Sequence, residues 1–330
     1  MTVDVGICST DHVNAEVYAA LLSELPDANL VGISGESRER VRKQANSVGA
    51  AAMSHQELMD AADGVVICST NAAHKALVDL ALRNDVAFLC EKPLATSLAT
   101  AREIRDRCAE SDVVAGMAMP IRYSRPMRRL KEQYEAGAVG ELIAVSGVNR
   151  GRMPGGWFVD PEQAGGGAVA DHTDHIVDIV RWITGEEIEE VYAETTTRFY
   201  DIPVEDVNLL SMTLSNGASF IMDGSWSTPQ KNSFWGDADV ELVGTEETLA
   251  ADCFGYRYDH VSDTGHGRHT ESIYWGADPN NALLRDFVAA IRGESTLAAA
   301  ATVDDAVRTA AVIEAAYESV ERGEPVDVDR

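Results

Sequence analysis

Lys92 is the first residue whose type and position could carry chemistry. It stands in the stretch CEKPLATSL at 90–98, before Pro93 and just after a short apolar run typical of a β-strand. Proline disfavours helical geometry in the residue that precedes it, so Lys92 is expected to be extended at the carboxyl end of that strand. Ligands bind at this edge of open α/β sheets. On this segment alone, the alternative of an ordinary surface lysine stays open.

An acid and an imidazole share a helix face in AGGGAVADHTDHIVDIVRWITG at 164–185. Asp171 and His175 are four residues apart, so both lie on one side of the helix that the apolar spacing predicts. Because histidine titrates near neutrality and a carboxylate can orient it, the pair can handle a proton. Alternatively, Asp171 only stabilises the positive end of the helix and His175 is a core histidine.

A metal site is the weakest interpretation of this helix. Asp171, His172, His175 and Asp178 are ligand types. However, no further His or Cys stands at partner spacing, and His172 points away from His175 on a helix. We therefore expect no metal.

The stretch VDVGICSTDHVN at 3–14 is typical of the strand, turn and helix that open a dinucleotide-binding domain. The usual glycines are mostly absent, and Ser9, Asp11 and Asn14 take their places. Ser9 is small enough for the turn, but the carboxylate of Asp11 would face phosphates at the helix N-terminus. We expect Asp11 to turn outward and cap the helix, and a cofactor to bind more weakly than usual.

The elements that must position these residues alternate along the first 120 residues. Short, β-branched apolar runs and helical stretches predict right-handed crossovers and a doubly wound parallel sheet. The expected strands are Val3–Cys8, Leu30–Ser34, Val65–Ser69, Ala87–Cys90 and Val113–Met117, and the expected helices are Ala15–Glu24, Arg38–Ser47, His55–Ala61, Ala73–Arg83 and Leu98–Ser111.

After Pro120 the pattern changes to longer strands that predict an antiparallel sheet. Asn216-Gly217 between two alternating runs predicts a type I′ hairpin, Gly293 and Gly323 should end helices, and residues 260–269 should form an exposed loop. The expected strands are Leu142–Val148, Val191–Phe199, Val207–Ser215, Ala218–Trp226 and Val240–Val243, and the further helices are Pro126–Ala136, Asn281–Arg292 and Val303–Arg322.

The composition restricts the class of partner. The chain carries 54 acidic and 27 basic residues, for a net charge of −27 spread along its length. Such a surface is typical of adaptation to high salt, with an acidic mesophile protein as the alternative, and it argues against nucleic acid as a partner. No apolar run approaches the roughly 20 residues of a membrane span, and we expect no signal peptide before the first strand. Five scattered cysteines (Cys8, Cys68, Cys90, Cys108, Cys253) indicate reduced thiols in a cytoplasm.

Taken in order, these segments resemble the Gfo/Idh/MocA oxidoreductases, the relatives of glucose–fructose oxidoreductase and inositol dehydrogenase. EKP at 91–93 is similar to the family's signature, and STNAAH at 69–74 to its nicotinamide-side loop. GGGAVADHTDHIVD at 165–178 is similar to its GGG-x-L-x-D-x-G-x-H-x-x-D segment, with Thr173 in place of the usual glycine. LRDFVAAIRG and AAYESVERGEPVDV near the end of the chain look like its C-terminal pattern.

The resemblance implies an α/β protein: a Rossmann domain at 1–120 and, at 121–330, a substrate-binding and oligomerisation domain with a large, mostly antiparallel open sheet. It further implies hydride transfer between NAD or NADP and a sugar, cyclitol or related polyol. Lys92 would touch the substrate oxygen and the nicotinamide, His175 would accept the proton, and Asp171 would position the substrate or Lys92. The expected cofactor contacts are Ser9, Thr10, Asp11, His12, Val13, Glu36, Arg38, Ser69, Thr70, Asn71, His74, Glu91 and Lys92, and the expected substrate contacts are Lys92, Arg122, Tyr123, Trp157, Asp171 and His175.

Several alternatives remain open from the sequence. Glu36 suits the ribose hydroxyls of NAD, whereas Ser37 and Arg38 suit the 2′-phosphate of NADP. A non-catalytic ligand sensor and an NAD-assisted glycosidase or lyase are the other functions that such a scaffold could serve. We expect a homodimer or homotetramer, because an open sheet face needs cover.

Overall fold

The computed structural model of the chain describes residues 2–232, 234–262, 269–274, 276 and 278–329. The chain forms two compact units. One comprises Met1–Tyr123, Glu162–Gly165 and Pro279–Ala310, and the other Ser124–Pro161, Gly166–Asp278 and Ala311–Arg330. Among the described residues, we find no helix with the length and apolar character that a bilayer crossing requires.

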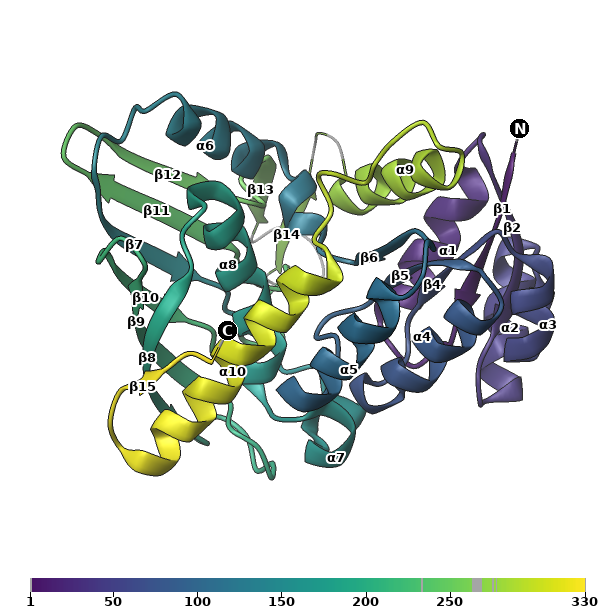
Figure 1. The fold of residues 1–330 in the computed structure, drawn as a ribbon, viewed down its shortest axis with the longest axis horizontal. Coiled ribbons are helices and arrows are strands. Elements are labelled where there is room, and N and C mark those ends of the chain that lie inside the picture. Colours follow the sequence, from purple (N-terminus) through teal and green to yellow (C-terminus); the bar gives the residue numbers. More distant parts are fainter. Residues whose placement is uncertain (1, 233, 263–268, 275, 277, 330) are drawn as a thin grey trace. The chain divides into compact units, whose positions relative to one another are not determined.

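The first unit is built on a six-stranded parallel sheet with strand order β3-β2-β1-β4-β5-β6 (Figure 1). The predicted doubly wound fold is therefore confirmed, although the two-residue strand β3 was not anticipated. The strands are β1 (Val3–Cys8), β2 (Ala28–Ser34), β3 (Ala51–Ala52), β4 (Gly64–Ile67), β5 (Ala87–Cys90) and β6 (Ala115–Met117). The helices are α1 (Asn14–Glu24), α2 (Arg38–Val48), α3 (His55–Ala61), α4 (His74–Arg83), α5 (Leu98–Ala109) and α9 (Pro279–Ile291).

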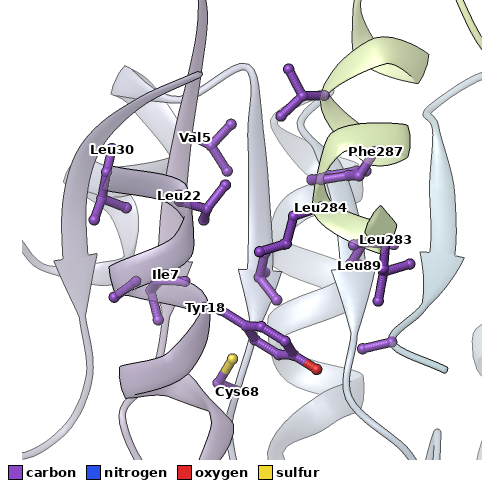
Figure 2. Packing of buried hydrophobic residues seen from close by; sticks show 14 of the residues in the cluster. Val5, Ile7, Tyr18, Leu22, Leu30, Cys68, Leu89, Leu283, Leu284 and Phe287 are labelled. Carbon is purple, nitrogen blue, oxygen red and sulfur yellow. The ribbon is translucent and has the colours of Figure 1, made fainter. Parts of the chain in front are cut away.

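Helix α9 closes the core of the first unit although it lies late in the sequence. Leu284 and Phe287 of α9 are completely buried with Val5 of β1 and with Tyr18 and Leu22 of α1 (Figure 2). Each such side chain contributes on the order of 1.5–3 kcal/mol by leaving water. The predicted division at residue 120 does not anticipate this return of the chain.

The second unit contains a seven-stranded sheet with order β12-β11-β7-β10-β9-β8-β15 (Figure 1). Its pairs are antiparallel apart from β7 with β10, so the expected mostly antiparallel sheet is confirmed. The strands are β7 (Leu142–Val148), β8 (Ile188–Thr196), β9 (Val207–Leu214), β10 (Ser219–Asp223), β11 (Asp239–Gly244), β12 (Thr248–Asp252) and β15 (Val326–Asp327). The second unit contains the helices α6 (Arg125–Glu135) and α8 (Ala168–Thr184), whereas α7 (Pro161–Ala164) falls mostly in the first unit and α10 (Val303–Arg322) contributes residues to both.

One face of this sheet packs against α8, and the other is open. Phe220 and Met222 of β10 are buried, whereas Ile221 between them is 59% exposed. On the inner face, Gly147 leaves room for Ile176 of α8, because a Cβ there would stand 2.4 Å from its Cγ2 atom. On the outer face, Ile143 and Leu209 are each half exposed.

The Asn216-Gly217 hairpin forms, but its predicted type is wrong. A type I′ turn needs positive φ at both central residues, and only Gly217 has it, at 85°. The amide N–H of Leu214 donates to the oxygen of Ala218, so the loop has three residues and ends on a left-handed glycine. The extra residue, Ser215, donates its amide to the carbonyl of Glu187, and this tertiary contact selects the longer loop.

The loop predicted at 260–269 is partly strand. Residues at its two ends belong to an antiparallel pair, β13 (Arg257–Ser262) and β14 (His269–Tyr274). The centre of the predicted loop, residues 263–268, lies outside the described residues. All five cysteines are free thiols, as expected, and four of them are buried.

Candidate active site

The turn after β1 replaces the missing glycines with a polar cluster. Ser9 adopts a left-handed φ of 77°, the geometry that a glycine usually supplies. Its hydroxyl donates to Oδ2 of Asp11 at 2.8 Å, and the guanidinium of Arg40 pairs with Oδ1 of the same carboxylate. The charge of Asp11 is thereby compensated.

The prediction that Asp11 caps helix α1 is wrong. Helix α1 begins at Asn14, whose amide N–H donates to the ring of His12 at 3.2 Å, and Val13 at the cap position supplies no side-chain acceptor. The ion pair with Arg40 explains why Asp11 does not cap the helix, because a carboxylate binds a guanidinium more strongly than it binds a neutral backbone amide. With its charge matched, this turn fits the diphosphate of a dinucleotide.

Glu91 joins the turn to the end of β5. It is buried, and its Oε1 accepts from the side-chain amide of Asn14 at 2.8 Å and lies 3.5 Å from Nδ1 of His12. The amide N–H of His12 also donates to the carbonyl of Cys68, at the end of β4. Residues from β1, β4 and β5 therefore meet at the carboxyl edge of the sheet, where the fold places ligands.

Lys92 lies at this edge, in a loop that a buried hydrogen bond stabilises. It is 6% exposed and is joined to Pro93 by a cis peptide bond. His74, which is predicted to contact a cofactor, is completely buried, and its Nδ1–H donates to the carbonyl of Pro93 at 2.9 Å. Burial lowers the pKa of His74 to about 4, so this ring is neutral near pH 7 and acts by positioning the Lys92 loop.

The loop with the predicted residues Ser69, Thr70 and Asn71 is tied to a distant segment of its own unit. Thr70 donates to Oε1 of Gln163 at 3.0 Å, and the amide of Asn71 donates to the carbonyl of Ala164 at 2.8 Å. The short helix η1 (Asn71–Ala73) begins in this loop, and η2 (Pro120–Tyr123) follows β6. The hydroxyl of Ser69 donates to the next carbonyl, so it supports the loop from within.

The residues that follow β2 include groups that suit the 2′-hydroxyl of NAD and groups that suit the 2′-phosphate of NADP. Glu36 is largely exposed and lies 3.5 Å from the ring of His55, while Ser37 caps helix α2 by accepting from the amide of Arg40. Arg38 is exposed. Arg40 is the residue that sequence reasoning missed here, and its signal was a second arginine one turn beyond Ser37.

Three predicted substrate contacts have partners within their own units. Arg122 is buried, donates to the carbonyl of Ala300 and lies 3.2 Å from Asp305. Tyr123 donates to Oδ2 of Asp286 at 2.6 Å. Trp157, in η3 (Gly156–Val159), stacks on Phe158 with ring centroids 3.9 Å apart.

Along most of its length, helix α8 is buried except at two polar residues. From Ala168 to Arg181 every residue is buried except Asp171 and His175. The two stand four apart, as predicted, so solvent reaches the helix along one stripe that carries an acid and an imidazole. Indole Nε1 of Trp226 donates to Oδ2 of Asp171 at 3.0 Å. Sequence reasoning missed Trp226, because it lies 55 residues away along the chain.

The first turn of α8 is held by a carboxylate from another part of the chain. Oε1 of Glu205 accepts from the amides of Gly167 and Val169, each at 3.0 Å, and from the hydroxyl of Tyr317 at 2.9 Å. A Cβ at Gly167 would stand 2.3 Å from the carbonyl oxygen of Glu205, and one at Gly166 would stand 1.8 Å from the hydroxyl of Tyr317. The glycine run thus allows Glu205 to cap the helix. Within the described residues, no His, Cys, Asp and Glu cluster has the geometry of a metal site.

Both domains of the chain match models of one known protein family. Residues 3–119 match the oxidoreductase family with an NAD-binding Rossmann fold, and residues 127–250 match the C-terminal domain of the same GFO/IDH/MocA family. The chain is 28% identical to D-apiose dehydrogenase of Rhizobium rhizogenes over 81% of this chain and 79% of that one. It is 27% identical to myo-inositol 2-dehydrogenase of Thermotoga maritima over 72% of this chain and 71% of that one.

A solved structure shows the same fold along the whole length. GenD2 from gentamicin A biosynthesis, in complex with NAD, superposes with a TM-score of 0.89 at 25% identity, covering 100% of this chain and 97% of that one. The two matched domains span most of the chain in the expected order. The chain therefore belongs to the Gfo/Idh/MocA family of NAD-binding oxidoreductases.

Proposed function

We propose that the protein is a dehydrogenase that transfers a hydride between a nicotinamide cofactor and a carbinol carbon of a sugar, cyclitol or related polyol. The observation that carries the proposal is the stripe on α8, where Asp171 and His175 are more exposed than any other residue from Ala168 to Arg181. Lys92 at the ligand edge of the Rossmann sheet supplies the complementary positive charge.

The three side chains have distinct roles in this proposal. His175, as a neutral imidazole, accepts the hydroxyl proton of the substrate. The ammonium of Lys92 stabilises the alkoxide that develops as that proton leaves, and Asp171 orients the substrate or Lys92. The nicotinamide supplies the redox chemistry when it is bound. Ser9, Glu91 and the end of β1 hold the turn that receives its diphosphate.

The relatives support the substrate class. D-apiose is a sugar and myo-inositol a cyclitol, and both names describe dehydrogenases. The compensation of Asp11 by Arg40 removes the main reason for a sensor that has lost its cofactor.

A substrate screen tests the function. Sugars and cyclitols are offered with NAD and with NADP in molar KCl, and formation of the reduced cofactor is followed by absorbance. We expect net reduction with at least one polyol. Binding of both reduced cofactors without turnover of any polyol would reject the dehydrogenase, and net substrate cleavage without net reduction would favour the glycosidase or lyase.

The pair of Asp11 with Arg40 gives a prediction about cofactor binding. Arg40→Gln leaves the carboxylate uncompensated beside the diphosphate, so we expect NADH to bind about fivefold more weakly, from a repulsion of about 1 kcal/mol. The double variant Asp11→Asn with Arg40→Gln should bind as the wild type does. Fluorescence titration at low salt measures the dissociation constants, with Arg42→Gln on the same helix as the control.

Two outcomes would contradict this account of Arg40. If Arg40→Gln weakened binding equally in the Asp11→Asn background, Arg40 would contact the cofactor itself. If the effect of Arg40→Gln were the same in molar KCl, it would not come from an exposed charge, because salt screens such charges.

We also propose a homodimer or homotetramer in a cytoplasm adapted to high salt. The outer face of the second sheet carries Ile143, Leu209 and Ile221, each half exposed or more, and a second copy is the natural cover for it. The net charge of −27 supports salt adaptation, because screening relieves self-repulsion. Sedimentation in molar KCl should give the mass of two or four chains, and a monomer would contradict the assembly.

A further inference from the structure

His172 follows Asp171 in α8 and is the one histidine of this helix that is completely buried. Its Nδ1 lies 2.8 Å from the carbonyl oxygen of Gly224. A carbonyl oxygen only accepts, so Nδ1 must carry a hydrogen. On the other side of the ring, Nε2 lies 3.2 Å from Oδ2 of Asp171. The protonation of Nε2 therefore decides whether this contact attracts or repels.

Among the described residues around the ring, no other group satisfies Nε2. Trp226 and Trp235 meet the ring edge-on, with centroids 6.5 and 5.4 Å away. Gly151 closes a further side, since a Cβ there would stand 2.8 Å from Cε1 of His172. None of the described residues donates to Nε2. A neutral ring would therefore bury a bare lone pair next to a carboxylate oxygen, which is a costly arrangement.

Trp226 indicates which partner holds the proton. Its indole N–H donates to Oδ2 of Asp171, the same oxygen that faces His172. A donor on this oxygen stabilises it as an anion, because hydrogen bonds to charged acceptors are the stronger ones. The proton between Asp171 and His172 is thus better placed on Nε2, where the attraction is coulombic at 3.2 Å and does not depend on hydrogen-bond alignment.

We propose that His172 is held as an imidazolium that is the counter-ion of Asp171, and that together with Trp226 it positions this carboxylate for the reaction. The second half of the proposal rests on the proposed function. His172 cannot pass a proton onward, because its Nδ1–H ends on a backbone carbonyl. Its role is therefore that of a fixed charge, a positioning residue that acts through Asp171.

The pair has a consequence for substrate class. An imidazolium and a carboxylate at 3.2 Å add no net charge to the polar stripe on α8. A neutral polyol hydroxyl can then approach Asp171 without a charged group of its own.

Histidine ring nitrogen NMR tests the ion pair without any substrate. The protein is labelled with ¹⁵N-histidine, and the His172 signal is the one that disappears in His172→Asn. We expect both ring nitrogens to be protonated in the wild type, and Nε2 to lose its proton in Asp171→Asn, where no anion remains to stabilise the charge. A neutral His172 ring with a bare Nε2 in the wild type would overturn the proposal.

Two matched variants test the positioning role. His172→Asn retains a donor near Gly224 but loses the contact to Asp171, whereas His172→Gln retains a neutral donor toward Asp171. We expect kcat to fall on the order of tenfold or more in the Asn variant and less in the Gln variant. Both should bind NADH normally, because the dinucleotide turn lies in the other unit. Trp226→Phe removes the second donor on Oδ2 and should lower kcat further in the His172→Gln background.

The outcomes separate the two proposals. A protonated ring with unchanged kcat in His172→Asn would overturn the positioning role and leave the dehydrogenase standing. If no polyol is turned over, the proposed function fails, yet the NMR result still decides the ion pair. Thermal unfolding checks that each variant is folded. If either His172→Asn or His172→Gln is not folded, the other one is compared with the wild type, so that kcat is always compared between folded proteins.

Discussion

Replacing Lys92 by methionine, or His175 by alanine, is expected to lower kcat by about 10²- to 10⁴-fold while cofactor binding persists. Methionine is chosen for Lys92 because this side chain is 6% exposed, so its stem should be retained and only the charge removed. The loss follows from the chemistry: hydride leaves a carbinol only as its hydroxyl proton is removed and the developing charge is stabilised. Steady-state kinetics on the substrate found in the screen measures the effect.

The combination of the two changes is more informative than either alone. If the ammonium and the imidazole act on the same oxygen, the double variant should lose little more than the worse single variant. Independent roles would instead make the losses multiply. Lys43→Met, on the exposed side of α2, is the matched control and should leave kcat unchanged. Turnover near the wild-type value in either single variant would reject the assignment of that residue.

The parts of the site that local rules govern were predictable from the sequence. Pro93 places Lys92 beyond the end of β5, and the spacing of Asp171 and His175 places them on one face of α8. Strand Val3–Cys8 and helix His55–Ala61 have the predicted bounds, because apolar periodicity and a capping box define them locally.

The parts that depend on distant contacts were not predictable. Arg40 forms an ion pair with Asp11 although the two residues are 29 positions apart, and no residue near Asp11 in the sequence indicates this pairing. Helix α9 has an ordinary amphipathic pattern. This pattern predicts that one face of the helix is buried, but it does not indicate that the helix belongs to the first unit. His74 matched the expected ligand loop by position, yet the fold turns its ring inward to Pro93.

Removing the acceptor at the first turn of α8 should cause the largest loss of stability. Glu205→Ala leaves the amides of Gly167 and Val169 and the hydroxyl of Tyr317 without their shared acceptor. A buried donor without a partner costs about 1–3 kcal/mol, so we expect the free energy of unfolding to fall by about 3 kcal/mol or more. Denaturant unfolding in molar KCl measures it. Because Asp171 lies in the same turn, kcat should fall as well.

Glu205→Gln distinguishes the contribution of the acceptor oxygen to stability from that of the negative charge. Glutamine keeps a carbonyl oxygen for the same three donors, so the free energy of unfolding should fall by less than about 1 kcal/mol. Tyr317→Phe is the intermediate control, since it removes a hydroxyl that donates to Glu205 and accepts from the amide of Gly167, and it leaves both amides bound to Glu205. Equal losses in the Ala and Gln variants would show that the charge, and not the acceptor, holds the helix.

The pH dependence of this pair has a definite sign. Burial raises the pKa of Glu205 above its ordinary value of 4.5, against the lowering effect of its hydrogen bonds. The folded protein therefore binds the proton of Glu205 more tightly than the unfolded chain does, and this group's contribution to stability falls as the pH rises above about 4.5. Glutamine does not titrate, so the stability of Glu205→Gln relative to the wild type should improve from pH 4.5 toward neutrality. A difference that stays constant over this range would mean that Glu205 titrates alike in the folded and unfolded states, and burial would then impose no net cost on its charge.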